Sequence, residues 1–159
     1  MKEYTIFIDS ANGSGALTHE KKYLFDWSIL PEGEYELTFT FLSNLKKVEE
    51  AEAEQITSAM TLEAVMPFSS CRYAVKTDGY ANHSNVLGFI KPEELDNWTE
   101  DAGHFSMRQW VSQVDNPSMR LFGKPQGNDF LIRLLKYNGT LATYSPVQYN
   151  MIIKLKHIC

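Results

Sequence analysis

Polar and apolar residues alternate near the C-terminal end of the chain, and this pattern predicts strands. One alternating run covers 130–135, and a second covers 149–156 after a turn signal at Asn138-Gly139. A period of two puts alternate side chains on opposite faces, so we expect one face in a core and the other, with Lys154 and Lys156, in water. The expected core residues of the second run are Tyr149, Met151, Ile153 and Leu155. The chain is therefore expected to close on a buried strand that completes a sandwich or barrel.

The N-terminal part shows the same alternation. Tyr4 to Ile8 predicts a short strand with Tyr4, Ile6 and Ile8 on one face, and Tyr23 to Leu30 predicts a second strand. Pro31-Glu32-Gly33 then indicates a turn, in which Gly33 supplies a positive φ. The clearest alternation follows, and its expected core residues are Tyr35, Leu37, Phe39 and Phe41.

The middle of the chain predicts further short strands, at 57–66, 71–75, 85–90, 105–114 and 119–122. Between them we expect a single helical turn over 92–95, since proline is tolerated in the first turn of a helix, and a polar loop over 97–103. About eight or nine strands at turn spacing, with no alternation of strands and helices, predict an all-β sandwich or barrel.

Residues 46–56 differ in character, because two lysines are followed by a cluster of glutamates. The composition favours helix, but the stretch lacks an apolar stripe with which a helix could dock. We therefore expect a solvated acidic loop, or a short exposed helix, inserted in one domain that spans residues 1–159.

Charge and hydropathy exclude several classes of partner. The net charge of -5 argues against a nucleic-acid partner, since phosphate binding needs clustered Lys and Arg. No apolar run approaches the roughly 20 residues of a membrane-spanning helix, and the first residues lack the apolar segment of a signal peptide. Synthesis in a cytosol is expected, with Cys71 and Cys159 as free thiols rather than a disulfide.

Catalytic chemistry is not indicated by the titratable residues. The four histidines, His19, His83, His104 and His157, show no metal-ligand spacing. His157 is expected to face water beside Lys156, and Cys71 has no base near it in sequence. We therefore expect no catalytic residue, no cofactor and no metal. A cupin-like enzyme would need two or three histidines and a carboxylate at strand positions, and the histidines of this chain are too dispersed for that arrangement.

Three phrases of the sequence together resemble a known group of proteins. They are the opening strand that runs into Asp9-Ser10, the strand-turn-strand from Trp27 to Tyr35, and the ending 130–135 with Asn138-Gly139-Thr140 before 149–153. In these the chain resembles, over most of its length, the single-jelly-roll minor capsid and penton proteins of large DNA viruses of algae and protists and of their virophages.

The resemblance implies an eight-stranded antiparallel jelly-roll sandwich that functions by assembly in a virion. It implies copies that form a homo-pentamer at an icosahedral vertex, or single copies that cement major capsid proteins beside other minor capsid proteins, after synthesis in host cytoplasm. The family offers no catalytic residues. Candidate protein-contact residues are Tyr80, Trp98, Trp110 and Tyr144. The competing interpretation of Trp98 and Trp110 is that they cap the ends of the core.

A lectin-like jelly roll that binds carbohydrate is the alternative function. Such a module needs an aromatic platform and polar loop residues that hold the sugar hydroxyls. The candidates for that role are Asn82, His83, Asn85 and Asp101.

Overall fold

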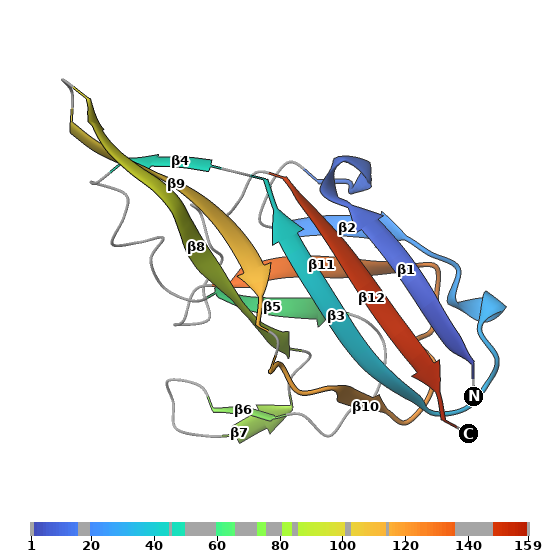
Figure 1. Ribbon diagram of the computed structural model, residues 1–159. Coiled ribbons are helices and arrows are strands. Elements are labelled where there is room, and N and C mark those ends of the chain that lie inside the picture. Colours follow the sequence, from blue (N-terminus) through green and yellow to red (C-terminus); the bar gives the residue numbers. More distant parts are fainter. Residues whose placement is uncertain are drawn as a thin grey trace.

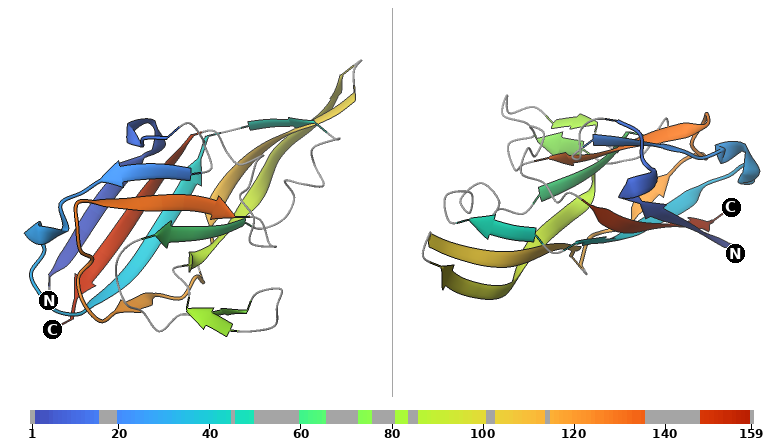
Figure 2. Two further views of the ribbon diagram at one scale, coloured as in Figure 1. Left: turned by 180° about the vertical axis from the view of Figure 1, so that it is seen from behind. Right: turned by 90° about the horizontal axis from the view of Figure 1, so that it is seen from above.

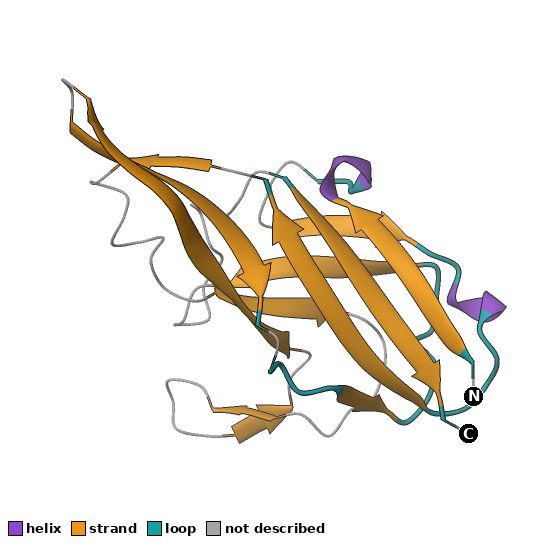
Figure 3. Cartoon of the chain, viewed as in Figure 1, coloured by secondary structure: helices purple, strands orange, loops and turns teal. Residues whose placement is uncertain are grey.

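Strands account for nearly all of the regular structure (Figures 1 and 3). The computed structural model describes residues 2–15, 20–44, 46–49, 60–65, 73–75, 81–83, 86–100, 103–113, 115–135 and 148–158. The strands are β1 (Glu3–Asp9), β2 (Glu20–Leu24), β3 (Tyr35–Ser43), β4 (Lys46–Glu49), β5 (Met60–Val65), β6 (Tyr73–Val75), β7 (Ala81–His83), β8 (Val86–Glu100), β9 (Gly103–Ser112), β10 (Met119–Leu121), β11 (Asp129–Leu135) and β12 (Tyr149–His157). Two short 3-10 turns, η1 (Ser10–Asn12) and η2 (Trp27–Ile29), are the helical elements of this described part.

Eight of the strands form one hydrogen-bonded path, in the order β1-β12-β3-β9-β8-β5-β11-β2. Along the chain these strands pair in a nested manner: β1 with β12, β2 with β11, β3 with β9 and β5 with β8, all antiparallel. The path folds into two layers, β1-β12-β3-β9 and β2-β11-β5-β8, whose strands cross (Figures 1 and 2). This nested pairing in two layers is the jelly roll, so the expected fold class is confirmed.

Four short strands lie off the main path: two of them pair with its strands, and the other two form a separate ribbon. β10 pairs with β3 and β4 pairs with β9, while β6 and β7 pair with each other. β6 falls within the strand expected at 71–75, and β10 within the one expected at 119–122.

The core lies between the two layers and follows the predicted alternation. Every inward residue expected on the last strand is buried, and so are Tyr35, Leu37 and Phe41 on β3, whereas Phe39 is half-buried and packs against the core. Trp27 and Trp110 are among its largest fully buried side chains. β12 lies between β1 and β3, so the chain does close on a buried strand.

The strand expected at 23–30 is shorter than predicted. β2 ends at Leu24, and η2 follows because the Asp26 carboxylate accepts hydrogen bonds from the Ser28 N–H at 3.0 Å and the Ser28 hydroxyl at 2.6 Å. This side-chain cap offers the backbone an alternative to the strand ladder. The turn also buries Trp27, whose indole N–H donates to the Asp129 carbonyl at 3.2 Å. Burial of one large ring thus overrides the extended pattern.

Two expectations between residues 92 and 103 were wrong. Instead of a helical turn and a polar loop, β8 continues to Glu100 and forms a long hairpin with β9, with a register shift between Glu94 and Asp96. Pro92 lies in the hairpin opposite Trp110. The Trp110 N–H donates to the Ser43 hydroxyl oxygen and not to β8, so Pro92 lies at a non-hydrogen-bonded position of the β8–β9 pair and costs no bond between these two strands.

The first residues of the expected acidic insert also form a strand. β4 pairs with β9 from Lys46 opposite Arg108 to Glu49 opposite Phe105. β3 meets β9 further along, at Leu42 opposite Val111, so β4 continues the same pairing beyond β3. Backbone pairing on a strand edge outweighs a helix preference that has no apolar stripe to support it. The rest of the insert, from residue 50 on, lies outside the described residues.

Candidate interaction surface

The outward side chains of β1, β12 and β3 lie in rows across the first layer, because the registers of these strands match residue by residue. One half of this outer face is polar. Its rows run Glu3, Lys156, Glu36 and then Thr5, Lys154, Thr38. Opposite charges therefore face each other across neighbouring strands, which is a mildly stabilising arrangement.

The other half of the same face carries apolar residues among the polar Asp9, Asn150 and Thr40. Phe7 of β1 lies opposite Ile152 of β12, and Leu42 of β3 lies opposite Val111 of β9. The Phe7 side chain is 78% exposed and that of Leu42 is 49% exposed, while Ile152 and Val111 are half-buried. Ile152 lies opposite Thr40, two positions from Leu42, within reach of a diagonal contact. We call Phe7, Ile152, Leu42 and Val111 the outer apolar patch.

Serine side chains hold β9 in place beside β3 and so complete this patch. The Phe41 N–H donates to the Ser112 hydroxyl oxygen at 3.0 Å, and the Trp110 N–H donates to the Ser43 hydroxyl oxygen at 2.8 Å. The Gln109 side-chain amide also donates to the Ser43 carbonyl, at 2.9 Å. Side chains thus take over pairing where the two backbones share a single register position, Leu42 opposite Val111.

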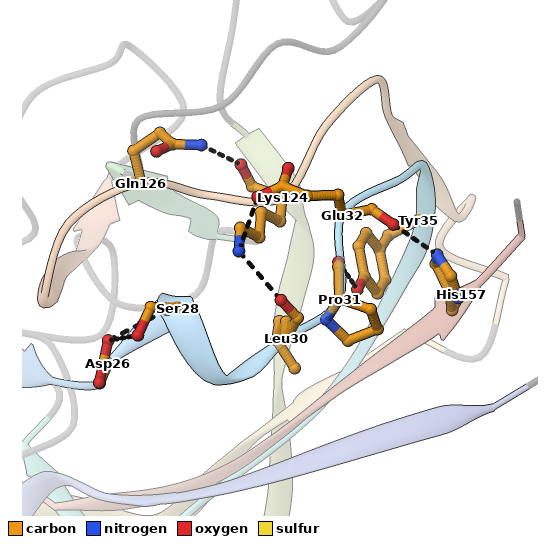
Figure 4. Close-up of polar contacts among 9 residues, drawn as sticks. All are labelled: Asp26, Ser28, Leu30, Pro31, Glu32, Tyr35, Lys124, Gln126 and His157. Atoms are coloured by element: carbon orange, nitrogen blue, oxygen red, sulfur yellow. Dashed lines mark hydrogen bonds and ion pairs between the residues drawn. The ribbon is translucent and has the colours of Figure 1, made fainter.

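Further exposed apolar side chains are Leu24 at the end of β2, Phe89 on β8, Phe122 after β10 and Ile29 on η2. The adjoining loop is held by Lys124, whose ammonium donates to the Leu30 carbonyl at 3.0 Å and pairs with the Glu32 carboxylate at 2.8 Å (Figure 4). Below we call these two contacts the Lys124 clamp.

Two further contacts fix the same loop. The Tyr35 hydroxyl donates to the Pro31 carbonyl, and the His157 ring hydrogen-bonds the Glu32 carbonyl at 3.0 Å (Figure 4). His157 is half-buried and its ring centroid lies 4.9 Å from that of Tyr35, so the expectation that it faces water is met only in part. The hydrogen bonds from Ser28 keep the pKa of Asp26 below its usual value. The polar groups of this loop are therefore engaged in holding its shape.

The residues expected at a protein contact fall in different places. Trp110 is 0% exposed, so its assignment as a contact residue is corrected: its ring belongs to the core. Trp98 lies on β8 near the tip of the β8–β9 hairpin. Tyr80 and Tyr144 lie outside the described residues. None of these residues belongs to the outer apolar patch.

The residues considered for sugar or metal binding are also separated or not described. Asn82 and His83 lie on β7, whereas Asn85 and Asp101 lie outside the described residues. His104 lies on β9, and His19, Cys71 and Cys159 are likewise outside. Within the described ranges, no group of three or more His, Cys, Asp or Glu residues is placed to hold a metal ion. No helix in those ranges is both long and apolar enough to span a membrane.

The outer apolar patch was missed at the sequence level, although a signal was present. Phe7, Leu42 and Ile152 are apolar residues out of phase with the core positions of their own strands. In an alternating strand with one face in water, such a residue marks an apolar spot on the solvated face.

Comparison with known proteins adds no relative. No protein-family model matches this sequence, and no curated protein matches it significantly.

Proposed function

We propose that this protein is a structural virion protein, a minor capsid or penton protein of an icosahedral double-stranded DNA virus. It acts by forming homo-oligomers or by cementing major capsid proteins. The observation that carries the proposal is the outer apolar patch on a rigid jelly-roll sheet, joined to the resemblance of the sequence to capsid proteins of this fold. A jelly roll alone does not define a function, since the fold serves many roles.

The patch supports assembly on physical grounds. Phe7 exposes most of its ring, and Leu42 about half of its side chain, on a sheet whose backbone is held by β12 on one side of β3 and β9 on the other. Apolar side chains on rigid elements lose little conformational entropy when a partner covers them. The charged rows of the polar half lie next to the patch and can fix the orientation of the partner.

The test is the mass of the purified chain in solution by light scattering, followed by negative-stain imaging and co-sedimentation with a double-jelly-roll major capsid protein. Closed rings of five, or a monomer that co-sediments with the major capsid protein, is the expected result. Particles purified from the source of the sequence should also contain the chain, as detected by mass spectrometry.

The opposite result is equally defined. A monomer that does not co-sediment with the major capsid protein and is absent from particles contradicts the proposal. Hits on a glycan array would then support the carbohydrate-binding alternative.

A further inference from the structure

The two ends of the strand path are treated differently by the fold. The edge of β2 is covered by the chain itself: the Ser14 N–H donates to the Lys22 carbonyl at 2.8 Å, and the Lys22 N–H donates to the Ser14 carbonyl at 2.9 Å. β1, at the other end of the path, pairs with β12 on one side and with no described strand on its other side (Figure 1). Below we call this second side the β1 edge.

The backbone groups that face the β1 edge follow from the register. The His157 N–H donates to the Lys2 carbonyl at 2.8 Å, and Lys2 lies one position before the pair of Glu3 with Lys156. Hydrogen-bonded and non-hydrogen-bonded pairs alternate in antiparallel strands, so Tyr4, Ile6 and Ile8 direct their backbone groups to β12. Glu3, Thr5, Phe7 and Asp9 direct theirs to the β1 edge, and the side chains of these four are exposed.

The β1 edge lacks most of the features that discourage strand addition. Tyr4 to Ile8 contains no proline, glycine or charged residue, and every residue in it favours strand. Beyond the bonds within its own turn, the chain segment between β2 and β3 makes its backbone hydrogen bonds to Gly127, Asn128 and Ile158 and none to β1. A five-residue uncharged strand, whose outward backbone groups pair with no described residue, is a template for another strand.

We propose that the β1 edge binds an extended segment of a partner protein as an added antiparallel strand. Side-chain chemistry defines the segment. Its residue opposite Phe7 is apolar, and its residue opposite Glu3, four positions later, is Lys or Arg. The Asp9 carboxylate accepts the Ala11 N–H at 2.9 Å as the cap of η1. Glu3 caps no turn; it lies opposite Lys156 on its β12 side, and on the β1 edge its carboxylate can select a basic residue.

Charge disfavours a second copy of β1 as the added strand. A symmetric antiparallel pair that uses the whole strand places Glu3 opposite Asp9 at both ends. Like charges directly opposite each other destabilise a strand pair. A foreign basic segment meets no such repulsion, and the net charge of -5 favours its approach.

The inference deepens the proposed function, since strand addition is one way for a capsid module to hold a neighbour. The probe is a synthetic seven-residue peptide designed to pair antiparallel with the seven residues of β1. It has isoleucine at position 3, opposite Phe7, and lysine at position 7, opposite Glu3, with threonine at positions 1 and 5 and valine elsewhere. Binding is measured by backbone amide shifts in NMR spectra. We expect shifts at Glu3, Thr5, Phe7 and Asp9, and an affinity at least about tenfold lower for the same peptide with glutamate seventh.

Two variants separate edge pairing from other binding. Thr5→Pro removes an N–H that faces the β1 edge and leaves the β12 ladder intact, whereas Thr5→Ala keeps the N–H and is the matched control. Thr5→Pro should lower the affinity for the lysine peptide by about tenfold or more, and Thr5→Ala should lower it by less than about threefold. Glu3→Lys, which keeps every backbone group, should reverse the preference between the two peptides.

The outcomes distinguish this inference from the proposed function. Equal binding to Thr5→Pro and Thr5→Ala, or shifts on β3 instead of β1, overturns strand addition even if the chain is found in virions. Specific binding at the β1 edge together with absence of the chain from virions would support strand addition and contradict the proposed capsid function. Absence of any amide shift with the lysine peptide at millimolar concentration also overturns the inference.

Discussion

The hydroxyls of Tyr23 and Tyr149 form a hydrogen bond of 2.7 Å inside the core, and this bond joins the two layers. Tyr23 lies on β2 and stacks on Phe130, while Tyr149 lies on β12 and stacks on Phe41. Burial raises the pKa of Tyr23 to about 12 and raises that of Tyr149 above its ordinary value. Each hydroxyl therefore depends on the other for its hydrogen bond, and both favour the neutral form.

A double-mutant cycle on this pair should show strong coupling. Tyr23→Phe or Tyr149→Phe alone leaves one buried hydroxyl without its partner, at a cost of about 1 to 3 kcal/mol in the free energy of unfolding. The double variant removes both polar groups and should cost less than the sum of the single variants. Urea denaturation measures all four proteins, and additive single-variant costs would contradict a mutual hydrogen bond.

The same pair predicts a loss of stability in alkali. A folded-state pKa above the unfolded value of 10.0 means that the folded chain holds more protons between pH 10 and about 12, so stability is complete below pH 10 and falls above it. Each such tyrosine contributes a slope of at most about 1.4 kcal/mol per pH unit. Urea midpoints at pH 9, 10 and 11 measure the slope, and the double phenylalanine variant should show a shallower one. An unchanged slope in that variant would refute the assignment.

At the scale of elements, the strands that could be predicted are those in which side chains alone decide the structure. In β3 and β12 strict alternation coincides with burial, so a local pattern is sufficient. η2, β4 and the β8–β9 hairpin could not be predicted, because each depends on a distant contact. η2 is held by the hydrogen bond from Trp27 to the Asp129 carbonyl, and β4 forms because its backbone pairs with β9. Pro92 is accommodated in the hairpin because it lies opposite Trp110 at a non-hydrogen-bonded position.

The candidate surface was predictable in its parts and not as a whole. Phe7 and Leu42 each stand out of phase within an alternating run, which a close look at either strand can find. Their grouping depends on β12 lying between β1 and β3, with Ile152 bridging them. That order joins residues more than a hundred positions apart in the chain, and no local pattern contains it.

The Lys124 clamp gives a prediction for the loop between η2 and β3. Lys124→Met keeps the length of the side chain but removes the bonds to the Leu30 carbonyl and the Glu32 carboxylate. We expect a loss of about 1 to 2 kcal/mol, because a largely buried carbonyl loses a charged donor. Hydrogen exchange should accelerate over 28–34, while Gln126→Ala, which alters an exposed neighbour, should change neither quantity. Unaltered exchange in Lys124→Met would show that the loop holds its shape without the clamp.

At the scale of the whole molecule, the outer face of the first layer is divided along the strands. The charged rows of Glu3, Lys156 and Glu36 lie toward the end that holds both termini, and the outer apolar patch lies toward the other end. A face with both halves can bury apolar area against a partner while the charges set its direction. Stability and assembly should therefore respond to different substitutions on this face.

A paired substitution in the patch tests this separation. Phe7→Lys with Leu42→Lys places charges at exposed positions, so the free energy of unfolding should change by less than about 1 kcal/mol. Assembly into rings, or co-sedimentation with the major capsid protein, should fall by about tenfold or more, because a partner would have to desolvate two ammonium groups. The matched control is Ser118→Lys with Asn128→Lys, which adds the same charge at exposed positions outside this face and should assemble within about threefold of the parent. Equal loss in both variants would mean that net charge, and not the patch, governs assembly. Loss in neither would move the contact surface to other exposed apolar side chains of the described residues, which include Leu24, Ile29, Phe89 and Phe122.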